Sequence, residues 1–265
     1  MEDAPAMNWT REAYRVYRVA VSTDLQTRAA AQPVKRASAP WKPWRSNIGL
    51  KIAMAVSGIL LVLFLIVHMA GNLHVFEGRE EMNAYAAGLR SFGEPLLPHE
   101  SLLWVLRIGL IVAVAVHIWS AVVLTRRALA ARPVRYASKK PAKGESRHAV
   151  ATMRWGAVVV FLFVIWHLLD LTWRTVNPVK HLPDAYGAVV ATVSPERWPV
   201  TVFYLLALVA LGFHLRHGVW SAVQTIGGPN TKWRGRTQAI SLAVAVVVVA
   251  GFAIVPLAVT FGLVS

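Results

Sequence analysis

The sequence predicts an all-α integral membrane protein, a bundle of five transmembrane helices. The chain has 265 residues, of which 56% are hydrophobic and only 15% are charged. Soluble domains carry about 25% charged residues, so this composition suits a chain in contact with lipid. The apolar residues form five continuous blocks of about the 20 residues that cross a bilayer. The blocks cover residues 50–73, 102–125, 151–174, 199–222 and 239–262. Transmembrane β-strands are short and alternate apolar with polar residues, which argues against a barrel.

The basic residues indicate the orientation of the bundle. The net charge of +15 would suit a nucleic-acid-binding protein. However, the basic residues concentrate before the first span, between the second and third, and between the fourth and fifth. The other two loops hold only Arg79, Arg90, Arg174, Lys180 and Arg197. Because cytoplasmic loops are enriched in Lys and Arg, we expect a cytoplasmic N-terminus and an outside C-terminus, in the inner (plasma) membrane.

Two parts of unequal size are expected. Residues 1–47 form a basic, proline-containing cytoplasmic arm with a short helix over 9–18, either a flexible tail or a docking arm for a soluble partner. Residues 48–265 form the transmembrane domain. Trp41 and Trp44, just before the first span, suit the aromatic belt of a membrane surface. The chain has no cysteine, which excludes disulfides and any thiolate-ligated metal site built from this chain alone.

The loops between the spans differ in character. The first span ends at Gly71 and Asn72, and the acidic outer loop 75–100 that follows is long enough to contain structure of its own. The second span ends at Arg126 and Arg127, and the third is expected to run to Trp173. The fourth ends near residue 222, before a Gly-Gly-Pro turn. The fifth span has no ionisable residue in its interior, so it is predicted to be a packing helix.

Four of the five spans carry a histidine, and the four fall at two depths. An ionisable side chain within a bilayer is a functional-site candidate by default. His68 and His167 lie about 24–27 Å from the inner surface, at a helical rise of about 1.5 Å per residue. His117 and His214 lie in spans of the opposite direction, roughly 22 Å from the outer surface. The sequence therefore predicts an outer pair, His68 with His167, and an inner pair, His117 with His214.

Paired histidines at two depths suggest a cofactor. Two imidazoles that face each other across a helix bundle form a bis-histidine axial site for haem iron. Two such sites would give electrons a path across the bilayer. Ser57 and Gly156 lie about three helical turns before His68 and His167, on the same helix faces at the inner depth. Small side chains there would leave room for the inner porphyrin.

Other interpretations of the histidines stay open at this point. A histidine within a span is often a polar packing residue or part of a proton path rather than a metal ligand. A single dinuclear metal site is disfavoured, because no span has a Glu-x-x-His motif. His217 lies one turn beyond His214 and competes with it, although the depth of His117 favours His214.

Three arginines near the pairs are candidates for binding haem propionates. Arg154 and Arg216 lie at the inner ends of the third and fourth spans, and Arg107 lies near the outer end of the second. The guanidinium group suits the geometry of a carboxylate. The alternative is that these side chains extend toward lipid headgroups.

The segments around the histidines resemble those of a known family. VHMAGN, VHIWS, WHLLDL and FHLRHGVW follow one another on the first four spans. They are similar to the cytochrome b membrane anchor of succinate dehydrogenase (succinate:quinone oxidoreductase, complex II), and of fumarate reductases. The single-chain, five-helix type with two b haems is the most similar, and LPHESLLWVLR before the second span resembles its actinobacterial members. The resemblance covers roughly residues 48–262.

The resemblance implies a role and partners. His68 and His167 match the ligands of the distal haem, and His117 and His214 those of the proximal haem, while His217 is an additional residue. The family passes electrons from a flavoprotein with covalent FAD, through an iron–sulfur subunit, to a membrane quinone (menaquinone or ubiquinone) in the respiratory chain and the tricarboxylic acid cycle. The dicarboxylate chemistry takes place on the partner subunits, so no residue of this chain is assigned to it.

A quinone site needs hydrogen-bond donors and proton carriers near a haem edge. Candidates at the outer end, which is slightly favoured, are His74, Glu94, Arg107 and Asp170; those at the inner end are Arg154, Arg216 and His217. Four alternatives remain: a haem-free anchor with another metal centre, direct transfer from iron–sulfur cluster to quinone, a transporter that uses the histidines as a proton relay, and a free-standing b-type cytochrome with another electron donor. The absence of internal repeats argues against the transporter.

Overall fold

The computed structural model describes residues 11–31, 46–131, 147–180, 184–227 and 233–265. The chain divides into two units, Met1–Lys42 and Pro43–Ser265. In the first unit, helix α1 runs from Arg11 to Ala31 and is longer than the helix expected over 9–18. Trp41 and Trp44 lie outside the described residues, as does most of the basic loop between the second and third spans.

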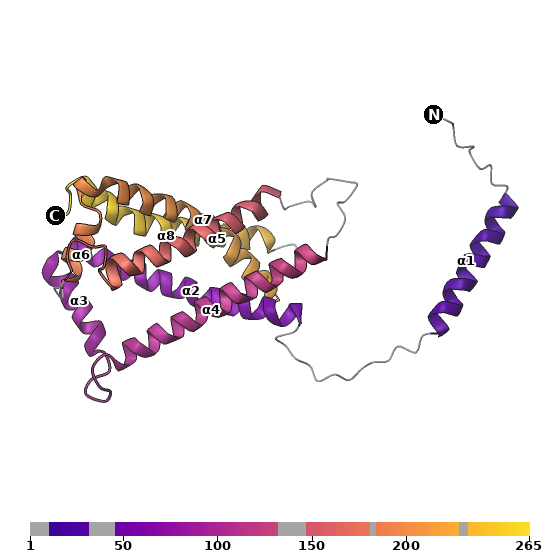
Figure 1. Ribbon diagram of the computed structural model, residues 1–265, viewed down its shortest axis with the longest axis horizontal. Coiled ribbons are helices and arrows are strands. Elements are labelled where there is room, and N and C mark those ends of the chain that lie inside the picture. Colours follow the sequence, from indigo (N-terminus) through magenta and orange to yellow (C-terminus); the bar gives the residue numbers. More distant parts are fainter. Residues whose placement is uncertain (1–10, 32–45, 132–146, 181–183, 228–232) are drawn as a thin grey trace. The chain divides into compact units, whose positions relative to one another are not determined.

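Five long helices make up most of the second unit (Figure 1). They are α2 (Asn47–Leu73), α4 (Ser101–Ala130), α5 (Arg147–His167), α7 (Trp198–Thr225) and α8 (Arg234–Thr260). Each belongs to a helical segment that is long and apolar enough to cross a membrane. The described part of the chain contains no strand. The chain is therefore an all-α, multi-pass membrane protein, as the sequence predicts; the orientation of its termini stays a prediction.

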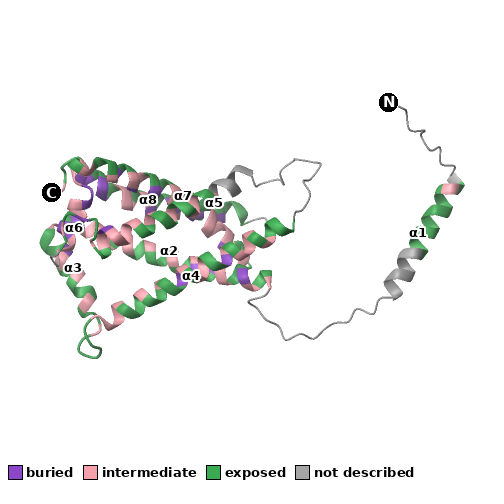
Figure 2. Ribbon diagram, in the orientation of Figure 1, coloured by how far each residue is buried: buried purple, intermediate pink, exposed green. Residues whose placement is uncertain are grey.

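Like α2, helix α7 packs against three of the other long helices. It packs against α8, α5 and α2, and α2 packs in turn against α4 and α8. Small buried residues, such as Ala207 on α7 and Ala245 on α8, let these helices approach closely. Much of the outer surface of each long helix is exposed (Figure 2), including large apolar side chains such as Val67 and Leu106. Such a surface suits lipid rather than water.

Short elements connect the long helices at one end of the bundle. They are η2 (His74–Glu77), α3 (Arg79–Ser91), α6 (Ala185–Thr192) and η4 (Pro195–Arg197). Asn83 of α3 holds the start of α6, because its Oδ1 accepts hydrogen bonds from the backbone N–H groups of Ala185 (2.8 Å) and Tyr186 (3.1 Å). Asp184 caps α6 by accepting from the N–H of Gly187 (2.8 Å). The loop expected to contain structure of its own therefore does so, and it contacts the second outer loop.

The Asp184 cap gives a prediction about pH. Burial raises the pKa of this carboxyl group, but hydrogen bonds from Gly187 and Asn83 and the charges of Arg79 and Arg174 outweigh burial and lower it. The stabilisation is therefore complete above the unfolded pKa of about 4 and is lost as the pH falls through the folded value. We expect Asp184→Asn to lower the melting temperature of the detergent-solubilised protein at pH 7, with a difference from wild type that shrinks below about pH 4.

A matched control for this prediction is Glu94→Gln, which removes a carboxylate whose partner is the exposed His99. It should change the melting temperature little, because exposed ion pairs contribute about 0–1 kcal/mol. A difference between wild type and Asp184→Asn that is constant from pH 7 to pH 3 would contradict the assignment.

The third span differs from its prediction at its C-terminal end. The α-helix stops at His167, and Leu168–Thr172 form a π-helical turn, η3. The N–H of Trp173 bonds to the carbonyl of Leu168 at 2.8 Å. A π turn is wider than an α turn and is frequently found at functional sites. It contains Asp170, whose side chain is fully buried.

Candidate functional site: two histidine pairs

The structure brings together the two histidines of each predicted pair. The ring centres of His68 on α2 and His167 on α5 lie 5.9 Å apart, and those of His117 on α4 and His214 on α7 lie 6.2 Å apart. The ring planes are inclined at 85° in the outer pair and 69° in the inner pair. Each pair therefore joins two helices that are not neighbours in the chain.

These separations match the space that one metal ion needs between two imidazoles. With metal–nitrogen bonds of about 2 Å, the two ligating nitrogens are about 4 Å apart and the ring centres about 6 Å apart. In addition, the Nδ1 atoms of His167 and His214 are buried and have no hydrogen-bond partner within the described residues. One nitrogen of each ring is thus left unsatisfied by the protein, which is costly for a buried polar atom. The residues present fit a bis-histidine centre at each depth.

The inner pair is held by contacts with α2. His117 Nδ1–H donates to the carbonyl oxygen of Met54 (3.1 Å), and Ser57 Oγ lies 3.4 Å from the same nitrogen. A ring protonated at Nδ1 carries its lone pair on Nε2, which is then free to bind a metal. A Cβ atom on Gly58 would lie 3.2 Å from His117 Cε1, so a glycine at this position lets the ring lie against α2. Ser57, predicted at the inner depth, lies beside His117.

Aromatic side chains surround the outer pair. Phe64 stacks on His68 at a centroid distance of 5.1 Å, and Phe252 of α8 lies 5.7 Å from the same ring. Phe163 and Tyr204 lie 5.7 and 6.2 Å from the ring of His167. These rings form an apolar environment that would exclude water from a group held by the pair.

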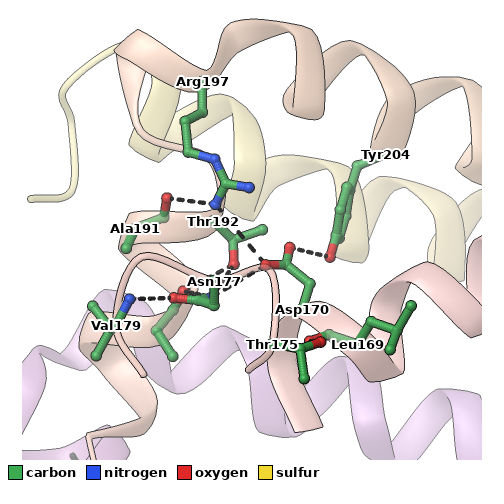
Figure 3. Close-up of polar contacts among 10 residues, drawn as sticks. Leu169, Asp170, Thr175, Asn177, Val179, Ala191, Thr192, Arg197 and Tyr204 are labelled. Atoms are coloured by element: carbon green, nitrogen blue, oxygen red, sulfur yellow. Dashed lines mark hydrogen bonds and ion pairs between the residues drawn. The ribbon is translucent and has the colours of Figure 1, made fainter. Parts of the chain in front are cut away.

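A buried polar cluster lies next to the outer pair (Figure 3). Asp170 Oδ2 accepts a hydrogen bond from the Tyr204 hydroxyl (3.2 Å), and Oδ1 accepts from Asn177 Nδ2 (3.3 Å). Arg197 Nη1 lies 3.9 Å from Oδ1. Asn177 Nδ2 also donates to Thr192 Oγ1 (2.9 Å), which connects the cluster to α6. We call these four residues, Asp170, Asn177, Arg197 and Tyr204, the Asp170 cluster.

Of the Asp170 cluster, sequence reasoning selected Asp170 alone. Tyr204 lies in an apolar span and is indistinguishable there from an aromatic packing residue. Asn177 and Arg197 lie in a proline-containing loop and at the start of a helix, where polar residues are common. No pattern in the sequence marked these three residues.

The other outer candidates have local partners. His74 Nδ1 lies 2.8 Å from Glu77 Oε2, and its ring stacks on Tyr85 at 4.4 Å. Glu94 pairs with His99 at 2.8 Å. The guanidinium of Arg107 lies over the ring of Trp104 at 5.0 Å. Their described contacts therefore do not bring them to the histidine pairs.

The inner candidates make no described ring contact or hydrogen bond with the pairs. Arg154 and Arg216 are exposed. The His217 ring packs against Trp220 (6.1 Å), whereas His214 faces His117. Among the described residues, no group of three or more His, Cys, Asp or Glu side chains is arranged to hold a metal ion.

One comparison with known proteins gives a match. Residues 130–252 match the family model of the succinate dehydrogenase/fumarate reductase transmembrane subunit. This segment is under half of the chain and contains one histidine of each pair, His167 and His214, and all of α7. No curated protein and no solved structure matches the chain. The family match supports an anchor-subunit assignment and bears on neither haem number nor quinone type.

Proposed function

We propose that this chain is the membrane anchor subunit of a succinate dehydrogenase or fumarate reductase, and that it passes electrons from an iron–sulfur subunit through two b haems to a membrane quinone. The observation that carries the proposal is the two histidine pairs of the bundle, with ring centres 5.9 and 6.2 Å apart. The family match over residues 130–252 supports the choice of enzyme complex.

In this proposal, the histidines are the axial ligands. His68 and His167 hold the outer haem, and His117 and His214 hold the inner haem. A bound haem would supply a one-electron carrier at each depth. The chain's own groups then orient the ligands: the carbonyl of Met54 fixes the proton of His117 on Nδ1, and Phe64 and Phe252 hold the ring of His68 in an apolar site.

The remaining charged residues have subsidiary roles. Arg154, Arg216 and Arg107 are proposed partners of the haem propionates, because exposed arginine side chains can turn toward a carboxylate. The quinone is proposed to bind at the outer end, near Arg107 and His74. Asp170 is less suited to contact the quinone, because it is fully buried and both its oxygens already accept hydrogen bonds.

The partners follow from the family. The flavoprotein with FAD and the iron–sulfur subunit would bind at the cytoplasmic face, next to the inner pair. Dicarboxylate oxidation or reduction takes place on those subunits. The chain would therefore purify as part of a complex rather than alone.

The proposal is tested by the visible spectrum of the purified complex. We expect a b-type difference spectrum between dithionite-reduced and oxidised samples and about two haems per chain by pyridine haemochromogen. Co-purification of a flavoprotein and an iron–sulfur protein tests the anchor role separately. A complex without haem would contradict the ligand assignment and leave the anchor role standing. A colourless chain that folds without partners would favour a histidine-relay transporter.

A further inference from the structure

Neither the electron path nor the quinone site of the proposed function uses the Asp170 cluster. Resting on the proposed function, we propose that Asp170 is a positioning residue for the outer haem: it holds Tyr204 against His167, and its charge lowers the reduction potential of the haem bound there.

The carboxylate of Asp170 connects the π turn to three other segments of the chain. Asp170 lies on the π turn directly after His167. Its partners come from α7 (Tyr204), from the loop before α6 (Asn177) and from η4 (Arg197). A fully buried carboxylate is costly unless it is hydrogen-bonded and paired. Removing it would therefore take away the group that connects these three segments to the π turn beside His167.

Tyr204 contacts both Asp170 and His167. Its hydroxyl is fixed by Asp170, while its ring packs edge-on against Phe163 at 4.9 Å and lies 6.2 Å from the ring of His167. The hydrogen bond from the Tyr204 hydroxyl to Asp170 thus fixes the position of the Tyr204 ring beside His167. Asp170 acts on His167 through Tyr204 and does not itself contact a reacting group.

The charge of Asp170 bears on the reduction potential of the outer haem. The two closest partners of the carboxylate, a hydroxyl and an amide, are neutral, and the guanidinium of Arg197 stands farther away, at 3.9 Å. The negative charge is therefore only partly balanced, and buried charges interact more strongly than charges in water. Oxidised haem iron is more positive by one charge than reduced iron. The carboxylate favours the oxidised form and lowers the potential, whereas Arg197 has the opposite effect.

The experiment is a redox titration of the haems in the whole complex at fixed pH, followed by absorbance. Asp170→Asn should shift the oxidised–reduced equilibrium of the outer haem about tenfold toward the reduced form, a rise of about 59 mV for a one-electron couple. Arg197→Met should shift the same component in the opposite direction. Simple disruption of packing would not give two shifts of opposite sign. The component that disappears in His68→Ala identifies the outer haem.

Two further variants separate positioning from charge. Tyr204→Phe keeps both the ring and the carboxylate, so we expect little change in potential but an altered low-spin ferric EPR signal of the outer haem, because His167 loses its fixed neighbour. Thr201→Val is the matched control. It removes another side-chain hydrogen bond of α7, the partly buried one to Thr260 Oγ1 (2.7 Å), in which Asp170 takes no part. It should leave both the potential and the EPR signal unchanged.

The outcomes distinguish this inference from the proposed function. A wild-type complex without haem overturns the haem assignment and this inference together. A wild-type complex with both haems, in which Asp170→Asn and Arg197→Met leave the outer potential unchanged or move it in the same direction, overturns this inference alone. If Asp170→Asn does not assemble, Arg197→Met decides: a lower potential supports the charge effect, and an unchanged or higher one overturns it.

Discussion

The His68→Ala variant is expected to contain about one haem per chain in place of about two, because it loses the outer haem. The His117→Ala variant is also expected to contain about one, because it loses the inner haem. The reason is geometric, because in the proposed assignment each haem has two axial ligands, and among the described residues no third histidine ring stacks within either pair. Pyridine haemochromogen gives the haem content of the purified complexes. Redox titration distinguishes which component is lost, since the two histidine pairs lie in different surroundings.

His217→Ala is the matched control for the histidine variants. It removes an imidazole from α7 one turn beyond His214, where the ring packs on Trp220 rather than on His117. Both haems should be retained. Loss of the inner haem in this variant, with retention in His214→Ala, would exchange the roles of the two residues.

The Gly58→Val variant is expected to lose the inner haem and keep the outer one. A Cβ atom at position 58 would already lie 3.2 Å from Cε1 of His117, and valine adds two methyl groups beyond it. Overpacking of this kind costs about 1–3 kcal/mol and is relieved by moving the neighbouring ring. The ring of His117 would then leave its hydrogen bond to Met54 and its place opposite His214. Haem content and redox titration measure the result.

Gly109→Val on α4 is the comparison for Gly58→Val. A Cβ atom at position 109 has no neighbour within 4 Å, so the same change of residue should be tolerated and both haems kept. Equal loss of haem from the two valine variants would show that valine harms the helices in general. The contact between Gly58 and His117 would then not be the cause.

The spans were predictable because lipid imposes one simple requirement, a long apolar block. Their ends were less predictable, since helices continue beyond the apolar part. Helix α4, for example, runs on through Arg126 and Arg127 to Ala130, and the guanidinium of Arg127 donates to Asn47 Oδ1 at the start of α2 (2.7 Å). Charged residues at a membrane surface do not need to end a helix, because their side chains reach water.

The pairing of the histidines was predictable for a related reason. The rise per residue of a helix is fixed, so position in a span gives depth. Depth alone favoured His214 over His217 but did not determine the rotation of the helix, which the structure supplies by the contact of His214 with His117. The roles of these residues as ligands stay predictions.

The π turn and the Asp170 cluster were not predictable from the sequence. A π turn depends on the side chains that its residues contact. The side chains that contact Asp170 come from α7, η4 and the loop before α6. Apolar blocks and histidine spacing carry no information about such contacts. Tyr204 was missed for this reason, since only its partner distinguishes it from an ordinary aromatic residue of a span.

The order of the histidines along the chain constrains biogenesis. Both histidines of the outer pair have been synthesised once α5 is made, but the inner pair still lacks His214 at that stage. The insertion of α7 then supplies two things at once, the second histidine of the inner pair and, through Tyr204, the ring that covers His167. In the proposed assignment, the ligands of the outer haem would therefore be complete before those of the inner haem, and the insertion of α7 would cover the outer pair and complete the inner one.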